Sequence, residues 1–152
     1  AAVDLANEDD TDAALLALDR IVDKGSDGYA TIAKMKKASL LIDKGLSDEG
    51  LSIYLDLERN AVDQSFRDIA TILYVLNSMD KIAPETLLKK IEPLENSKVW
   101  QSSALELKAF IFLKNNNKKL AKETFQSILN LKTSPSSLST RARNMVEYLK
   151  EE

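Results

Sequence analysis

Residues 121–128, AKETFQSI, place a small residue, an aromatic residue and an aliphatic residue at positions i, i+4 and i+7. This spacing puts the three side chains on one face of a helix. Three other segments have a small or apolar residue, a large residue and an apolar residue at the same positions: 14–21 (ALLALDRI), 50–57 (GLSIYLDL) and 87–94 (LLKKIEPL). Successive segments begin 36, 37 and 34 residues apart. A nearly constant step of this length is typical of proteins built from repeated helix-turn-helix units.

The first residue of each triplet is expected where two helices cross. A small side chain there lets the helices approach, and the larger residue four positions later fills the space before the next pair. The preceding helix has matching positions twelve residues upstream, at Ala38 and Leu41 and again at Ala109 and Phe112. We therefore expect an all-α fold: a right-handed α-solenoid of about four helix pairs, closed by a C-terminal capping helix, in a single domain over residues 1–152. An irregular helical bundle is the alternative.

Residues that end helices divide the chain into eight predicted helices. Gly25 and Gly45 are expected to stop two of them in the left-handed conformation, and residues 115–117 (NNN) are expected to form a turn. Pro93 has no amide hydrogen, so the fifth helix should end or kink just before it, with Leu94 still packed inward. The predicted helices cover residues 11–24, 29–44, 48–60, 64–78, 84–92, 99–114, 118–131 and 139–150.

The composition argues against catalysis. The 152 residues include no His and no Cys, which excludes imidazole bases, thiolate nucleophiles and zinc sites made of these residues. The four glycines do not fall in a phosphate-binding frame. The acidic run at residues 8–12 lacks the glycine and glutamate positions of a calcium loop. We therefore expect no catalytic residues, no metal site and no cofactor.

Charge is distributed unevenly along the chain. The net charge of −3 divides into −6 over residues 1–29, −2 over residues 30–97 and +5 over residues 98–152. Solvated helix faces explain this gradient, and orientation on a charged partner is the alternative. Lys118, Lys119 and Lys122 form a basic cluster, but aromatic residues for base stacking do not alternate with them. We therefore expect no nucleic-acid binding.

Two stretches resemble tetratricopeptide units. The first covers residues 28–54 and opens with Gly28-Tyr29-Ala30, and the second covers residues 100–125. Together with Val99-Trp100 and the segment 133–138 before the last helix, they are similar to one bacterial family. That family contains the membrane-anchored ancillary subunit of the Sec translocon. Gly50 and Leu87 depart from it, because alanine is usual at these positions.

The resemblance implies a non-enzymatic protein-interaction scaffold of the bacterial cell envelope. It implies one N-terminal membrane helix, expected before residue 1, and a repeat domain on the periplasmic side of the inner membrane. The partners would be other proteins: client polypeptides, chaperones or translocon components. A soluble cytosolic tetratricopeptide adaptor is one alternative. An enzyme or regulator with a closed, polar small-molecule pocket is another.

The first helix of each pair is expected to line a concave groove that binds protein. Methionine and aromatic side chains suit an adaptable apolar surface, and Arg67 offers a cation to a carboxylate or carbonyl group. Packing in the core is the alternative for the aromatic residues, and Trp100 is either packed at a helix junction or an exposed anchor. The candidate groove residues are Met35, Lys36, Ser39, Ile42, Arg67, Thr71, Tyr74, Glu106, Phe110 and Leu113.

Overall fold

The computed structural model describes residues 11–24 and 27–150, and every regular element within these ranges is a helix. The expected all-helical class is confirmed. The elements are α1 (Thr11–Lys24), α2 (Asp27–Asp43), α3 (Ser47–Asn60), α4 (Gln64–Ser78), α5 (Pro84–Ile91), the 3₁₀ helix η1 (Glu92–Asn96), α6 (Gln101–Lys114), α7 (Lys118–Asn130) and α8 (Ser136–Lys150).

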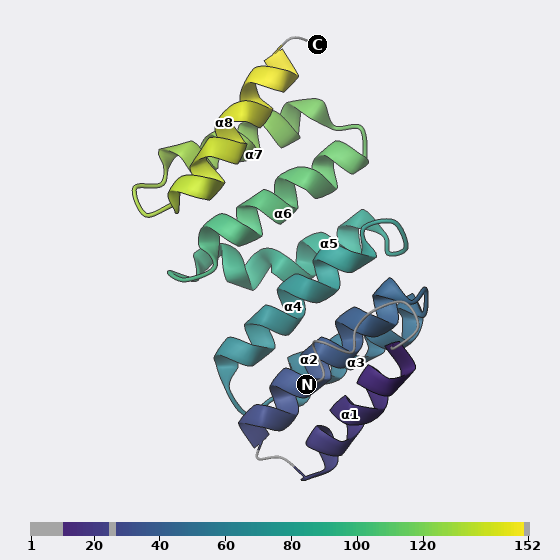
Figure 1. The fold of residues 1–152 in the computed structure, drawn as a ribbon. Coiled ribbons are helices and arrows are strands. Elements are labelled where there is room, and N and C mark those ends of the chain that lie inside the picture. The colour runs from purple at the N-terminus through teal and green to yellow at the C-terminus, as the bar shows by residue number, and fades with distance from the viewer. Residues whose placement is uncertain (1–10, 25–26, 151–152) are drawn as a thin grey trace. The chain divides into compact units, whose positions relative to one another are not determined.

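The chain divides into two compact units, an N-terminal unit of residues 1–74 and a C-terminal unit of residues 75–152, with the boundary inside α4. In the N-terminal unit α2 packs against both α1 and α3 (Figure 1). In the C-terminal unit α7 packs against both α6 and α8, while α5 and η1 pack against α6. Helices α1, α2 and α3 therefore pack in chain order in one unit, and helices α6, α7 and α8 pack in chain order in the other.

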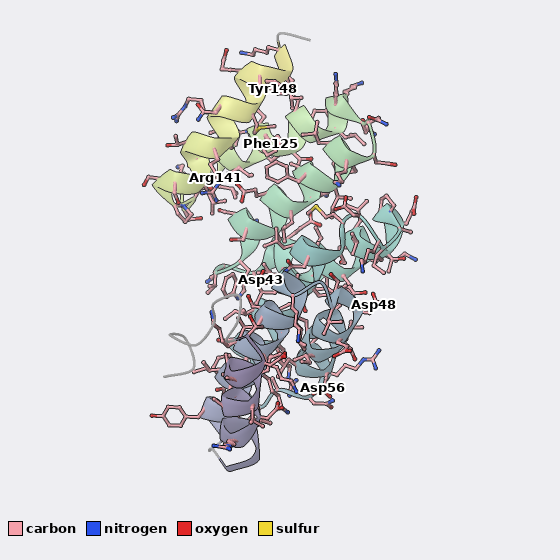
Figure 2. All side chains as sticks on the ribbon, turned by 45° about the vertical axis from the view of Figure 1, so that its right-hand side comes forward. Asp43, Asp48, Asp56, Phe125, Arg141 and Tyr148 are labelled. Atoms are coloured by element: carbon pink, nitrogen blue, oxygen red, sulfur yellow. The ribbon has the colours of Figure 1, made fainter. Side chains whose placement is uncertain are left out.

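Each unit buries its own apolar residues. In the C-terminal unit the ring of Phe125 is fully buried, and it meets the ring of Phe110 edge to face at 5.3 Å between centroids (Figure 2). Burial of apolar surface of this kind is the main favourable contribution to folding. The clusters are Ala14, Leu18, Ala33 and Leu40, then Leu57, Ala61 and Ala70, both in the N-terminal unit, and Ala109, Ala121, Phe125, Ile128, Ala142, Val146 and Leu149 in the C-terminal unit.

The triplets found in the sequence occupy these cores. Every member whose side chain is described is buried, and the side chain of Ile21 lies outside the described residues. Gly50 shows why a small residue is needed. A Cβ atom on it would lie 2.7 Å from the carbonyl oxygen of Ala38 and 2.7 Å from Cγ1 of Ile42. Helices α2 and α3 therefore approach so closely here that even the Cβ atom of an alanine would clash.

The hairpin of α2 and α3 and the hairpin of α6 and α7 use the same type of turn. Gly45 has φ +93°, its amide donates to Ile42 O at 3.0 Å, and the next amide donates to Leu41 O at 2.8 Å. Asn116 has φ +59°, its amide donates to Leu113 O at 3.1 Å, and the next amide donates to Phe112 O at 2.9 Å. This pair of bonds defines a Schellman motif, which satisfies carbonyl groups at a helix end. The predicted stop at Gly45 and the predicted turn at 115–117 are confirmed, whereas Gly25 lies outside the described residues.

The α2–α3 hairpin has a counterpart 71 residues later in the chain, in α6–α7. Most of the buried positions correspond at this offset, as do the left-handed turn residues, the small crossing residue and several buried positions of α4 and α8. The α2–α3 and α6–α7 hairpins thus bury residues in the same pattern. The matched buried pairs are Thr31/Ser102, Ala33/Ala104, Ala38/Ala109, Leu40/Ile111, Gly50/Ala121, Tyr54/Phe125, Leu57/Ile128, Thr71/Ala142, Val75/Val146 and Ser78/Leu149.

Helix α5 ends before Pro93, as predicted. The chain tightens there into η1, and Leu94 is buried. Three helices begin two or three residues away from the predicted position: α2 at Asp27 rather than residue 29, α6 at Gln101 rather than residue 99, and α8 at Ser136 rather than residue 139. The ends of α2 and α7 and the start of α3 differ from prediction by one residue. At the start of α8 the carbonyl of Pro135 accepts the Ser139 amide at 3.0 Å, so the serines form the first turn of the helix.

Candidate functional site

The predicted groove residues are divided between the two units. Five of the main candidates (Met35, Lys36, Ile42, Arg67 and Tyr74) belong to the N-terminal unit, and two (Glu106 and Phe110) belong to the C-terminal unit. Their surroundings are given unit by unit.

In the N-terminal unit most of these side chains take part in packing. Met35 packs against the Leu57 cluster, and Ile42 faces Gly50 across the α2–α3 contact. The guanidinium Nε of Arg67 donates to Ala61 O at 2.6 Å, so it holds the end of α3. Tyr74 is buried, with 7% of its surface exposed, while Lys36 and Ser39 are half-buried on α2.

In the C-terminal unit Glu106 is engaged by a cation of the same unit. Arg141 donates to it twice, from Nε at 2.9 Å and from a terminal nitrogen at 3.1 Å (Figure 2 labels Arg141 on α8). These hydrogen bonds, followed by the negative charge of Glu106, raise the pKa of Arg141 above its usual range. The pair joins α6 to α8, and a two-pronged contact of this geometry fixes orientation as well as charge.

An apolar hollow of about 310 Å³ lies on the C-terminal unit and includes Phe110. Its wall is formed by Leu76 from α4, by Met79 just after that helix, and by Phe110 and Leu113 from α6. Leu76 is 54% exposed, although it is a large apolar residue. We take this hollow as the candidate functional site.

The hollow carries one charged residue at its edge. Lys114 lines it and forms an ion pair with Asp80, and both side chains are exposed. The four apolar side chains include a flexible methionine and an aromatic ring, a combination that suits apolar ligands of varied shape. The chemistry that this site offers is therefore recognition of apolar groups beside a charged edge.

Sequence reasoning identified Phe110 and Leu113 but missed Leu76 and Met79. Helical phase pointed to Arg67, Thr71 and Tyr74 on α4, and the structure buries Thr71 and Tyr74. The missed signal is the run Ile72-Leu73-Tyr74-Val75-Leu76, which is apolar on every side of the helix. A helix end that is apolar all round has to leave part of that surface outside the core unless a partner covers it.

Trp100 directly precedes α6 and is half-buried. Its amide donates to the Ser97 side chain at 3.2 Å, and its carbonyl accepts the Ala104 amide at 2.8 Å. The residue therefore takes part in starting α6.

A second hollow of the C-terminal unit is polar. It has a volume of about 440 Å³ and is lined by residues of α5, η1 and α6, including Glu92, Glu95 and Lys108. Lys108 and Glu95 form an ion pair at 2.8 Å across it. This ion pair occupies two of the charged groups that line the hollow.

Comparison with protein-family models, with curated proteins and with solved structures finds no match to this chain. Among the helices within residues 11–24 and 27–150, none is long and apolar enough to cross a membrane.

Proposed function

We propose that this protein is a non-enzymatic helical-repeat scaffold, of the tetratricopeptide type, that binds an apolar segment of another protein. The apolar hollow formed by Leu76, Met79, Phe110 and Leu113 carries the proposal. Apolar side chains gathered at one exposed place are a recurrent property of protein-binding surfaces.

The dimensions of the hollow suit a peptide side chain rather than a whole small-molecule substrate. Its volume of about 310 Å³ is at the lower end of the range of small-molecule sites, roughly 300–1,000 Å³. Its partner would insert one or two apolar side chains beside Lys114. The repeated helix pairs supply a rigid support, which is how helical-repeat proteins generally present a binding surface.

The cellular setting of this proposal follows the family resemblance of residues 28–54 and 100–125. It is a repeat domain on the periplasmic side of a bacterial inner membrane, where client polypeptides, chaperones or translocon components would be the partners. A soluble cytosolic adaptor with the same hollow is the alternative. Fractionation of cells that express the natural full-length gene product distinguishes the two.

The proposed binding surface is tested by site-specific photo-cross-linking in intact cells. A photoreactive amino acid replaces Leu76 in one variant and Leu16 in another, because the two leucines are similarly exposed (54% and 57%) and Leu16, on α1, is not among the residues that line the hollow. We expect a discrete protein adduct from position 76 that is absent from position 16. The adduct should disappear when Met79→Asp is added, since a carboxylate there opposes insertion of an apolar side chain.

Equal adducts from both positions, or an adduct at position 76 that survives Met79→Asp, would show that the hollow is not the binding surface. Far-UV circular dichroism of each variant shows whether the helical fold is retained.

A further inference from the structure

The α2–α3 and α6–α7 hairpins have opposite charges at their equivalent turns. The acidic tip is residues 43–49, where α2 passes into α3, and the basic tip is residues 114–120, where α6 passes into α7. The 71-residue offset relates the two segments. The acidic tip has three carboxylates and one ammonium group, whereas the basic tip has three ammonium groups and no carboxylate (Figure 2 labels Asp43 and Asp48 of the acidic tip).

Ion pairs within the chain preserve this difference between the tips. Lys44 is the one cation of the acidic tip, and it pairs with Asp12 of α1. Lys114 of the basic tip pairs with an aspartate that precedes α5. Glu49 and Lys119 form no ion pair with any residue that the structure describes. The acidic tip therefore keeps a negative charge that is available to a partner, and the basic tip keeps a positive one.

Helix stability explains the acids but not the lysines. Asp48 and Glu49 lie in the first turn of α3, where carboxylates suit the positive end of the helix dipole. The first turn of α7 contains Lys118 and Lys119 and no acid. Two ammonium groups there oppose the dipole, and Asn117 already caps this helix by accepting a backbone amide at 3.1 Å. Residues that break a local rule of this kind are often functional.

Each tip also has features that suit a contact with another protein surface. Leu46 at the acidic tip is 39% exposed, and Leu120 at the basic tip is 38% exposed. Lys119 and Lys122 line a hollow of about 360 Å³ on α7, so a carboxylate that enters this hollow meets two ammonium groups. Apolar groups surrounded by polar and charged groups are the usual composition of a protein interface.

We propose that the basic tip of one copy of this chain binds the acidic tip of a second copy. The complementary charges and the two exposed leucines all belong to this chain and lie at equivalent turns, which favours a second copy as the partner. The contact joins two different surfaces, so it is head-to-tail, and each copy keeps one tip available for a further copy. It does not use the apolar side chains of the hollow at Leu76, and neither proposal depends on the other.

Sedimentation velocity of the chain at increasing concentration tests self-association. In about 20 mM salt we expect the weight-average mass to rise with concentration, with a dissociation constant on the order of 0.1 mM, because small charged contacts give weak complexes. In about 0.5 M salt the association should be at least about tenfold weaker, since charges are then screened within a few ångströms.

Charge reversal identifies the two surfaces. Lys118→Glu with Lys119→Glu, and Asp48→Lys with Glu49→Lys, should each remain monomeric alone, because the two tips of each variant then have the same sign. An equimolar mixture of the two variants should associate about as tightly as the unmodified chain, since every contact between them again joins opposite charges. Carboxylates in the first turn of α7 suit its dipole, so loss of the fold does not explain a loss of association in the first variant.

Lys98→Glu with Arg143→Glu is the matched control. It changes the net charge of the C-terminal unit by the same amount, at two exposed positions outside the basic tip that form no ion pair with a described residue, and it should associate like the unmodified chain. Circular dichroism of each variant shows whether the helical fold is retained.

Four results would overturn the proposal. They are a chain that stays monomeric at about 1 mM in low salt, undiminished association after reversal of Lys118 and Lys119, an equimolar mixture that stays monomeric, and equal weakening in the control variant. The basic tip is also tested against vesicles that contain phosphatidylglycerol. Binding to these vesicles by a chain that stays monomeric would assign the tip to an anionic membrane surface instead of a second copy.

Discussion

Gly50 shows how one residue sets the distance between two helices. Glycine in a helix interior costs up to about 1 kcal/mol relative to alanine, because the unfolded chain loses more freedom. The 2.7 Å approach of a Cβ atom to the Ala38 carbonyl oxygen explains why glycine is nevertheless favoured here. The backbone oxygen is part of α2 and cannot rotate away as a side chain can.

We therefore predict that Gly50→Ala destabilises the protein by about 1–3 kcal/mol, the usual cost of overpacking. Gly28→Ala is the matched control, because a Cβ atom there has no neighbour within 4 Å, and it should stabilise α2 by up to about 1 kcal/mol. Urea unfolding followed by circular dichroism measures both. If Gly50→Ala proved as stable as Gly28→Ala, the close helix contact would be refuted.

Tyr54 makes the free energy of unfolding depend on pH in the alkaline range. Burial, with a smaller effect from the negative charge of Asp43, raises the pKa of its phenol above the usual 10.0. Above pH 10 the unfolded chain therefore releases a proton that folded Tyr54 retains, so the free energy of unfolding falls as pH rises through this range.

We predict that Tyr54→Phe makes this alkaline loss of stability less steep, as measured by urea unfolding at several pH values between about 9 and 11. Tyr29→Phe, at an exposed position of α2, is the matched control for the loss of one phenol. Identical pH dependence in the two variants would contradict the assignment of this effect to Tyr54.

The helix hairpins show which parts of the fold can be predicted from sequence. The turns at Gly45 and at residues 115–117 were predictable, because few residues tolerate a left-handed backbone and both turns use one that does. The break before Pro93 was predictable for an equally local reason. The start of α8 was not, because its serines favour loops as much as first helical turns, and the choice depends on how the segment packs.

The two equivalent turn residues should respond to substitution with opposite signs. Gly45→Ala places a Cβ atom on a residue with φ +93°, so it should lower the free energy of unfolding by about 1–2 kcal/mol. Asn116→Gly removes a Cβ atom from a residue with φ +59°, so it should raise the free energy of unfolding by up to about 1 kcal/mol. A Cβ atom at Gly45 meets nothing within 4 Å, so its cost is conformational. Thermal unfolding of both variants measures this, and a change of the same sign in both would be inconsistent with equivalent turns.

At the scale of the whole molecule, the candidate site was harder to predict than the fold. Repeated triplets identify buried positions because they depend on helical period alone. Leu76 and Met79 are candidates because they line one apolar hollow together with side chains of α6. Such a site depends on contacts between residues more than 30 positions apart in the chain, and a single sequence does not encode these contacts as a pattern.

The two compact units predict local rather than uniform responses to core mutations. Phe125→Ala removes a fully buried ring and should lower the free energy of unfolding by about 3–5 kcal/mol. In helical-repeat proteins stability is approximately a sum of local terms. Hydrogen exchange should therefore accelerate more in α6, α7 and α8 than in α1, α2 and α3. Equal acceleration in all six helices would show that the chain unfolds as one cooperative body.

The 71-residue offset between the hairpins also defines a unit of length for engineering. A longer array made by concatenating copies of this chain's segments would keep the order of helices and turns if each added block had 71 residues, for example residues 65–135. A block of another length would bring a loop sequence to a place where the next copy needs a helix. Tandem genes with one extra block are therefore a direct measure of how modular this architecture is.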